Sequence, residues 1–321
     1  MKCINKKWKI FICITLAAMC LSGCVTSKEL VASYEMEHYN KNLYQDHFFS
    51  ESLCVSAEDV ALENANTDTN IHASALFDLN QKKVLQASNM HEKIYPASTT
   101  KILTAYVALK YGKLEDTIKI SKAAVDFQVG ESTCGLKEGD TWSLKDLLYG
   151  LMMESGNDAA VAISELISGS EDEFMKLANQ EAKELGATHT HYTNPHGLHE
   201  EDHYTTAYDL YLMFQAAIKN EVFLEIIQAS TYKVSIVGAD TSTRELVFEP
   251  TNLYAKGEAD KPTNVTLIGG KTGTTTQARY CLVLLEKDEQ DNNYISIVMG
   301  AETKPILYVD MTALIQAIPS T

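Results

Sequence analysis

A serine and a lysine three residues apart, Ser98 and Lys101, stand directly before an apolar run at residues 102–109. If this run is helical, both side chains lie on one face, with the lysine beside the serine hydroxyl. A helix N-terminus and burial both disfavour a charged lysine, so Lys101 would be a neutral base able to take the Ser98 proton. The pair therefore predicts a serine nucleophile, although this spacing alone also occurs by chance on surface helices.

Two later segments have the chemistry to complete such a site. Ser155-Gly156-Asn157 lies between two predicted helices, and Lys271-Thr-Gly ends an apolar strand that contains two further glycines. Taken alone, the first segment is ordinary helix-capping chemistry and the second is a plain turn. The glycines would also let an extended peptide approach the strand edge and bind by strand addition.

The three segments together, in this order, resemble the signature of penicillin-binding proteins and serine β-lactamases: Ser-x-x-Lys, Ser-x-Asn and Lys-Thr-Gly. Longer stretches narrow the resemblance to the low-molecular-mass D-alanyl-D-alanine carboxypeptidases. These stretches are residues 96–106, 148–160, 194–198 and 203–210. The resemblance covers about residues 73–314, and it implies the β-lactamase/transpeptidase-like fold.

The resemblance also implies a reaction, the release of the terminal D-Ala from peptidoglycan stem peptides. Ser98 would attack the penultimate D-Ala carbonyl and form an acyl-enzyme, with Lys101 as its base. Ser155, backed by Asn157, would relay a proton to the leaving D-alanine, and water would then hydrolyse the acyl-enzyme. β-Lactam antibiotics would bind the same serine covalently, and the reaction needs no metal or cofactor.

Substrate binding would fall to the Lys-Thr-Gly strand. By the same resemblance, Lys271 and Thr272 would hold the terminal carboxylate of the peptide. Backbone N–H groups of Ser98 and of Thr274, which follows Gly273, would form the oxyanion hole.

The sequence departs from the family pattern in two places. Relatives usually have Ala-Gly-Tyr after the Lys-Thr-Gly strand, whereas this chain has Ala-Arg279-Tyr. We predict that Arg279 points toward the substrate carboxylate. Many relatives also add a small β domain and a C-terminal anchor helix, whereas this sequence stops at Thr321. A lipid at the other end would replace that anchor.

The first 24 residues are typical of an export signal. Basic residues 1–9 precede a 12-residue apolar run at residues 10–21, which is too short for a comfortable membrane span. The run ends in Leu-Ser-Gly-Cys24, which resembles the lipobox of bacterial lipoproteins. Residues 1–23 would be removed, and a two-chain lipid on Cys24 would anchor the protein to the outer face of the bacterial membrane. A signal peptide cut elsewhere and an uncleaved anchor are the alternatives.

The rest of the chain predicts a tether and one folded domain. Residues 24–70 are polar, acidic and weakly periodic, as expected of a flexible tether. In residues 71–321 a hairpin and the Ser98 helix come first, capped helices follow, and a strand meander with a closing helix ends the domain. This order predicts an α+β fold: an antiparallel sheet flanked by helices, with an all-helical insertion at about residues 112–228.

Composition excludes some classes of protein. The 321 residues carry a formal net charge of −16, which disfavours nucleic-acid binding and indicates a well-solvated surface. After loss of the signal and lipidation of Cys24, three cysteines remain: Cys54, Cys134 and Cys281. They allow at most one disulfide and match no zinc-binding spacing.

Three alternative functions stay open. Five histidines between His189 and His203 lie among acidic residues, which raises a metal-dependent peptidase, although the spacing matches no helical His-Glu-x-x-His pattern. His196 resembles part of the family's His-Gly-Leu turn. A serine β-lactamase shares the three motifs but hydrolyses its acyl-enzyme quickly, often with a dedicated glutamate, which the sequence does not identify. A non-catalytic wall-binding lipoprotein of the same fold is the third alternative.

Overall fold

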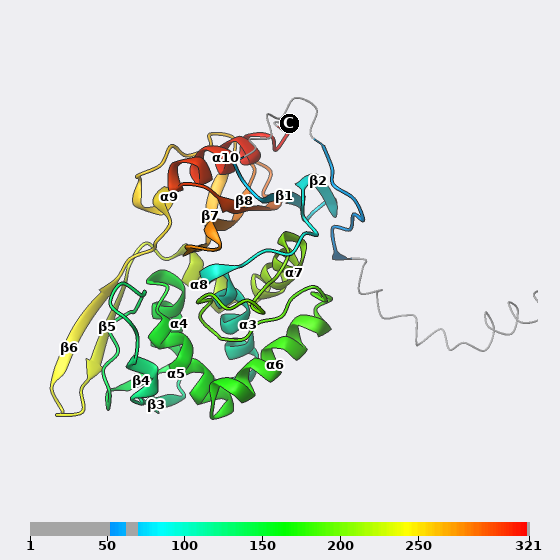
Figure 1. Cartoon of the computed structure of the whole chain (residues 1–321). Coiled ribbons are helices and arrows are strands. Elements are labelled where there is room, and N and C mark those ends of the chain that lie inside the picture. Colours follow the sequence, from blue (N-terminus) through cyan, green and yellow to red (C-terminus); the bar gives the residue numbers. More distant parts are fainter. Residues whose placement is uncertain (1–51, 62–69, 320–321) are drawn as a thin grey trace, which may run out of the picture. The chain divides into compact units, whose positions relative to one another are not determined.

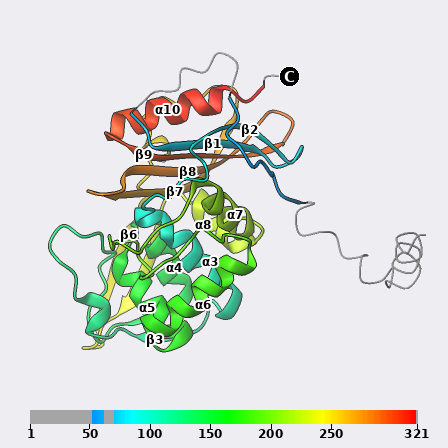
Figure 2. The same ribbon diagram turned by 45° about the vertical axis from the view of Figure 1, so that its right-hand side comes forward.

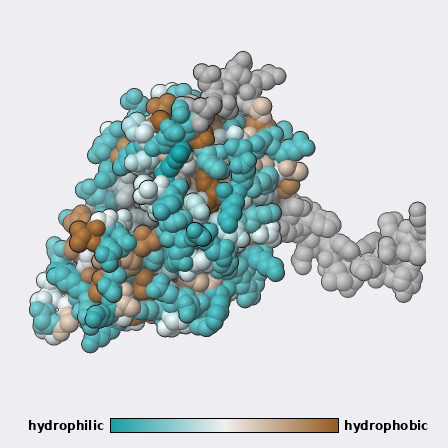
Figure 3. All heavy atoms as spheres, in the orientation of Figure 1, coloured by the Kyte–Doolittle hydropathy of each residue, from teal (hydrophilic) through white to brown (hydrophobic). Residues whose placement is uncertain are grey.

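The structure is a computed structural model that describes residues 52–61 and 70–319 (Figure 1). The predicted signal peptide, Cys24 and most of the predicted tether lie outside these residues. Within the described residues, no helix combines the length and the apolarity needed to cross a membrane. On the face shown in Figure 3 the surface is mainly hydrophilic, with apolar side chains in small, separate patches.

A five-stranded antiparallel sheet joins the two ends of the domain, in the order β2-β1-β9-β8-β7. Its strands are β1 (Ala73–Asp78), β2 (Lys83–Ser88), β7 (Thr266–Thr275), β8 (Arg279–Lys287) and β9 (Asn293–Ala301). Helix α10 (Lys304–Gln316) and the short helix α9 (Leu253–Lys256) cover one face, and the helices of residues 101–228 form a layer on the other (Figure 2). Alternation along β8 fits this sandwich, because Leu282 and Leu284 pack on the α10 side and Cys281, Val283 and Leu285 on the other.

The helical layer is built around α3 (Lys101–Tyr111), which contacts five other helices. These are α4 (Leu144–Met153), α5 (Asn157–Ser168), α6 (Glu171–Glu184), α7 (Ala207–Ala217) and α8 (Glu221–Gln228). The predicted caps are present, since the side chains of Ser143, Ser170 and Thr206 each accept an N–H from the first turn of α4, α6 and α7. A single-turn 3-10 helix, η2 (Ala97–Thr100), leads into α3 and carries Ser98.

A second antiparallel sheet corrects one detail of the predicted fold. Its order is β3 (Thr117–Lys119), β4 (Thr141–Ser143), β5 (Tyr232–Val237) and β6 (Thr243–Phe248). The fold class is α+β as predicted, but residues 112–228 are not entirely helical, because they contain β3 and β4. Strands of three residues are too short to show an alternating pattern in the sequence.

Residues 53–61 pack on the domain, although the sequence assigned them to the tether. Cys54 is fully buried, and its N–H donates to the Tyr211 hydroxyl at 2.8 Å. Val60 and Ala87 exchange backbone hydrogen bonds of 3.1 and 2.8 Å at the edge of β2. The domain therefore begins near Leu53 rather than near Ile71. Local polarity hid this segment, because its partners lie far away in the sequence.

Candidate active site

Ser98 sits in a tight turn between an extended segment and α3. Ala97 has a φ of +49°, a left-handed conformation that is disfavoured for a residue with a Cβ atom. The hydroxyl of Thr99 donates to the carbonyl of Pro96 at 2.7 Å, and that of Thr100 donates to the carbonyl of Ala97 at 2.8 Å. These side-chain bonds close the turn and present a half-buried Ser98 at the start of the helix.

Lys101 is fully buried and its amine lies among three oxygen atoms. Nζ is 3.0 Å from Ser98 Oγ, 2.8 Å from Asn157 Oδ1 and 2.5 Å from the carbonyl oxygen of His196. Burial, with the nearby charge of Lys271 adding to it, holds the pKa of Lys101 well below its usual range. The lowered pKa favours the neutral form of the amine.

The partners of Lys101 also determine which way its protons point. The oxygen atoms of Asn157 and His196 can only accept hydrogen bonds, so the two protons of a neutral amine point toward them. The nitrogen lone pair then faces the Ser98 hydroxyl, which can donate to it. This arrangement can draw a proton from Ser98 as its oxygen attacks an electrophile.

Ser155, in the connection between α4 and α5, and Asn157, the first residue of α5, join this cluster. Ser155 has a φ of +60° and is almost fully buried, which directs its hydroxyl toward the site. Lys271 Nζ, from β7, donates to Ser155 Oγ at 2.9 Å and to the carbonyl of Thr272 at 2.8 Å. Burial lowers the pKa of Lys271 to about 7.

Strand β7 passes so close to the Ser98 turn that only glycine fits at position 273. A Cβ atom there would lie 2.9 Å from the carbonyl oxygen of Pro96 and 3.1 Å from the backbone nitrogens of Ser98 and Thr99. The strand therefore forms one wall of the site, and Gly273 and the exposed Thr274 both line the space beside Ser98.

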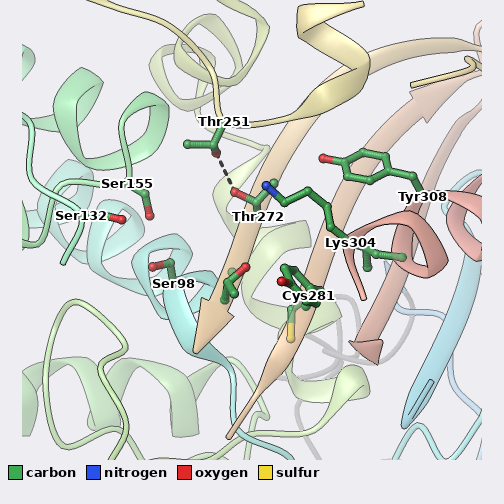
Figure 4. A pocket seen from close by; sticks show the side chains of 12 residues that line it. Ser98, Ser132, Ser155, Thr251, Thr272, Cys281, Lys304 and Tyr308 are labelled. Atoms are coloured by element: carbon green, nitrogen blue, oxygen red, sulfur yellow. Dashed lines mark hydrogen bonds between the residues drawn. The ribbon is translucent and has the colours of Figure 1, made fainter. Parts of the chain in front are cut away.

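A cavity of about 220 Å³ lies between β7, the Ser98 turn and the start of α10 (Figure 4). Seven of its lining residues were not predicted from the sequence as site residues: Ser132, Thr251, Tyr280, Cys281, Lys304, Leu307 and Tyr308. Thr251 Oγ1 is 2.6 Å from Thr272 Oγ1, so the two hydroxyls form a pair in the wall. A cation in the first turn of a helix is disfavoured by the helix dipole, and this position of Lys304 is the only signal that the sequence offered.

The structure does not bring Arg279 into the cavity. Its guanidinium Nη1 lies 3.5 Å from Glu302 Oε1, and about half of each side chain is exposed. Arg279 has a φ of +58° at the start of β8, and its neighbour Tyr280 lines the cavity instead. This left-handed turn explains why glycine suits the position, and it turns the Arg279 side chain away from the predicted contact.

The histidine-rich segment, residues 189–203, supplies the His196 carbonyl that accepts from Lys101, and it buries the rings of His196 and His203. Burial lowers the pKa of His196 and of His203 to about 3, so both rings are neutral. His191 Nδ1 lies 3.2 Å from Asp202 Oδ2 near the surface. Within residues 52–61 and 70–319, no group of three or more His, Cys, Asp or Glu side chains is arranged to hold a metal ion.

The site thus brings together Ser98, the buried Lys101 amine, a second serine–lysine pair and a glycine-containing strand, a set of groups suited to nucleophilic attack by a serine. Residues 61–303 match the profile of the D-alanyl-D-alanine carboxypeptidase family of peptidases. The chain belongs to this family, as the sequence motifs predicted.

Two carboxypeptidases illustrate the relationship. The chain is 35% identical to D-alanyl-D-alanine carboxypeptidase DacF of Bacillus subtilis over 234 residues, which cover 72% of this chain and 57% of DacF. It is 34% identical to DacC of Escherichia coli over 249 residues, which cover 75% of this chain and 59% of DacC. The chain therefore spans less than two thirds of the length of either relative.

Solved structures agree on the fold. The Streptomyces K15 DD-transpeptidase superposes with a TM-score of 0.72 at 26% identity, covering 79% of this chain and 98% of the transpeptidase. A penicillin-binding protein homologue from Mycobacterium tuberculosis has a TM-score of 0.68 at 27% identity, with 82% of this chain and 96% of the homologue covered. The predicted β-lactamase/transpeptidase-like fold is confirmed.

Proposed function

We propose that the protein is a serine-type D-alanyl-D-alanine carboxypeptidase that releases the terminal D-Ala of peptidoglycan stem peptides. One observation carries this proposal. The buried Lys101 amine has two carbonyl oxygens as acceptors for its protons, so its lone pair points at Ser98 Oγ, 3.0 Å away. Family membership supplies the substrate class. No metal or cofactor is needed.

Acylation uses the groups around Ser98. Its oxygen attacks the carbonyl carbon of the penultimate D-Ala while the proton passes to Lys101. Backbone N–H groups of Ser98 and Thr274 stabilise the negative charge that develops on the carbonyl oxygen. The C–N bond then breaks, and the leaving nitrogen takes a proton through Ser155, which Lys271 contacts. Water later attacks the ester, with Lys101 again as base, and frees Ser98.

The far side of the cavity provides recognition of the terminal carboxylate. Thr272 and Thr251 place two hydroxyls on one wall, and the buried Lys271 adds a cation behind it, in contact with the Ser155 hydroxyl. Lys304 adds a second cation from α10, in place of the predicted Arg279. A carboxylate prefers such charged and hydroxyl donors.

The same serine supports covalent binding of β-lactams, which carry a strained amide and a carboxylate. Among the described residues that line the cavity none is acidic. The lining of this cavity, in the described part of the chain, thus offers no carboxylate of the kind that activates water in a fast β-lactamase. This favours slow release of the β-lactam acyl group and the peptidase over the lactamase.

The site of action follows from the N-terminal sequence. We propose that residues 1–23 are a lipoprotein signal peptide and that lipid on Cys24 holds the enzyme at the outer face of the bacterial membrane. The basic start, the short apolar run and the final Leu-Ser-Gly-Cys support this placement. Metabolic labelling with a fatty-acid probe would test it, because Cys24→Ala should abolish incorporation.

The decisive experiment is mass spectrometry of a pentapeptide ending in D-Ala-D-Ala after incubation with wild type and with Ser98→Ala. We expect wild type to release one D-alanine and the variant to release none. Release that persists in a folded Ser98→Ala protein, or no release by wild type, would overturn the proposal. Fluorescent penicillin should label Ser98 for a long time, whereas rapid nitrocefin turnover would identify a lactamase.

A further inference from the structure

A chain of hydrogen bonds connects the histidine-rich segment to the turn that presents Ser98. We propose that His203, acting through Thr100, is a positioning residue for the nucleophile, which it holds by fixing the carbonyl of Ala97. His203 is 2% exposed and lies outside the cavity lining, so it touches neither the substrate nor the reacting atoms. The inference rests on the proposed function only in taking Ser98 as the nucleophile.

The direction of each hydrogen bond in the chain can be assigned. The backbone N–H of Thr193 donates to His203 Nδ1 at 3.1 Å, so this ring nitrogen is an acceptor. Because the buried ring is neutral, its proton is on Nε2, which lies 2.8 Å from Thr100 Oγ1 and donates to it. The Thr100 proton is then left for the Ala97 carbonyl, at 2.8 Å. Every donor in the series has one acceptor.

The carbonyl at the end of this chain belongs to a strained residue. Ala97 has a φ of +49°, which a residue with a Cβ atom adopts only when its surroundings hold it there. Residue 97 directly precedes Ser98, so rotation of Ala97 toward ordinary φ values would move the nucleophile. Fixing the Ala97 carbonyl therefore fixes the direction in which Ser98 leaves the turn.

The same carbonyl also contacts the loop that holds Lys101. A Cβ atom at Gly197 would lie 2.0 Å from the Ala97 oxygen, and Gly197 has a φ of +90°, so only glycine allows this approach. The preceding residue in that loop, His196, accepts the Lys101 hydrogen bond through its carbonyl. A shift of Ala97 would thus disturb both partners of the Ser98–Lys101 pair.

The His203 ring is itself held in place. Tyr192 stacks on it with ring centroids 4.7 Å apart and planes 7° apart. Thr193 contributes its hydroxyl, 3.1 Å from Nδ1, beside its backbone N–H. Residues 192 and 193 therefore fix the position of the His203 ring, and the ring in turn fixes the Thr100 hydroxyl.

Paired substitutions separate positioning from general loss of structure. Thr100→Val removes the hydroxyl at nearly constant volume, whereas Thr100→Ser keeps it. His203→Asn keeps an acceptor near the position of Nδ1 but has no donor at the position of Nε2, which contacts Thr100. In His203→Gln the longer side chain can place its amide N–H there and restore this donor. Thr104→Val is the matched control, because the buried Thr104 hydroxyl, in the first turn of α3, donates to the Pro195 carbonyl at 2.7 Å, toward the same loop but away from Ser98.

We expect Thr100→Val and His203→Asn to be acylated by fluorescent penicillin about 10- to 100-fold more slowly than wild type, because small displacements of a nucleophile are costly. With pentapeptide, kcat should fall while KM stays within about twofold, since the carboxylate wall is unchanged. Thr100→Ser, His203→Gln and Thr104→Val should stay within about threefold of wild type, even if Thr104→Val is less stable.

Wild-type acylation rates in Thr100→Val, or an equal slowing in Thr104→Val, would overturn the proposal. The penicillin assay does not depend on peptide hydrolysis, so labelling without D-alanine release would refute the carboxypeptidase and still test the positioning role. If wild type is not labelled, a crystal structure of Thr100→Val decides: we expect Ala97 to relax and Ser98 to move from Lys101, and an unchanged Ser98–Lys101 contact would refute the role.

Discussion

Two buried lysines share the site, and their different surroundings suit them to different tasks. Lys101 has its pKa lowered mainly by burial and points at Ser98, and in the proposed mechanism it acts as a base only when neutral. Lys271, with a pKa of about 7, contacts Ser155, and the binding of a carboxylate proposed for it requires the charged form. Opposite protonation states are therefore needed at two amines of the same residue type.

This difference predicts a bell-shaped pH dependence of kcat/KM. As pH falls, Lys101 takes up a proton and acylation slows; as pH rises through about 7, Lys271 loses its charge and carboxylate binding weakens. A bound carboxylate raises the pKa of Lys271, so the alkaline limb should lie at higher pH in kcat than in kcat/KM. In Lys271→Arg, which keeps its charge, the alkaline limb near neutrality should vanish, and a limb that persists would assign it to another group.

At the scale of elements, α10 supplies a cation to the cavity although it lies after the last strand. Lys304 lines the cavity, whereas Arg279 on β8 pairs with Glu302 outside it. We therefore expect Lys304→Met to raise KM for the pentapeptide about tenfold, by loss of a charged contact with the carboxylate.

Arg279→Gly is the matched control for that change, since it also removes one positive charge. It should leave KM within about twofold and, by relieving a left-handed residue, leave stability unchanged or raised by about 1 kcal/mol. Steady-state kinetics and urea unfolding of both variants check this, and a KM effect in Arg279→Gly alone would restore the contact predicted from the sequence.

The contact between β7 and the Ser98 turn leads to a further expectation. Gly273→Ala would place a methyl group 2.9 Å from the Pro96 carbonyl oxygen and 3.1 Å from Ser98 N, so the strand and the turn must separate. We expect a loss of about 1–3 kcal/mol in stability. Acylation should fall about tenfold or more, because both the nucleophile and the oxyanion site move. If a folded Gly273→Ala protein were acylated by penicillin at the wild-type rate, the Ser98 turn would be able to move without loss of reactivity, contrary to this expectation.

The predicted site residues that lie together in the structure are those with a local pattern in the sequence. Ser98, Lys101, Ser155, Asn157 and Lys271 stand in short motifs at helix starts and at a strand end, and the structure brings all five together. Thr251 and Lys304 have no such motif, because their role arises only when the β6–β7 connection and α10 meet the same cavity.

At the scale of the whole molecule, the order of elements was enough to predict the main sheet and its helical layer. Long strands such as β8 and capped helices such as α6 carry periodicity and start signals over many residues. Strands β3 and β4 of the second sheet were missed because they have three residues each and are held by partners distant in the sequence. Tertiary pairing of this kind leaves no local pattern.

The N-terminal boundary of the domain also depends on contacts between residues distant in the sequence, and it can be tested by truncation. Residues 53–61 bury Cys54, pair Val60 with Ala87 and engage the hydroxyls of Tyr211 and Tyr208. A protein that starts at Asn70 loses this burial and leaves those groups without their partners. We expect it to be less stable than one that starts at Ser52 by about 2–4 kcal/mol. Urea unfolding of both proteins measures the difference, with the protein starting at Cys24 as reference. Equal stability of all three would place residues 53–61 in the tether after all, whereas a loss confined to the Asn70 start makes them part of the enzyme's folded domain.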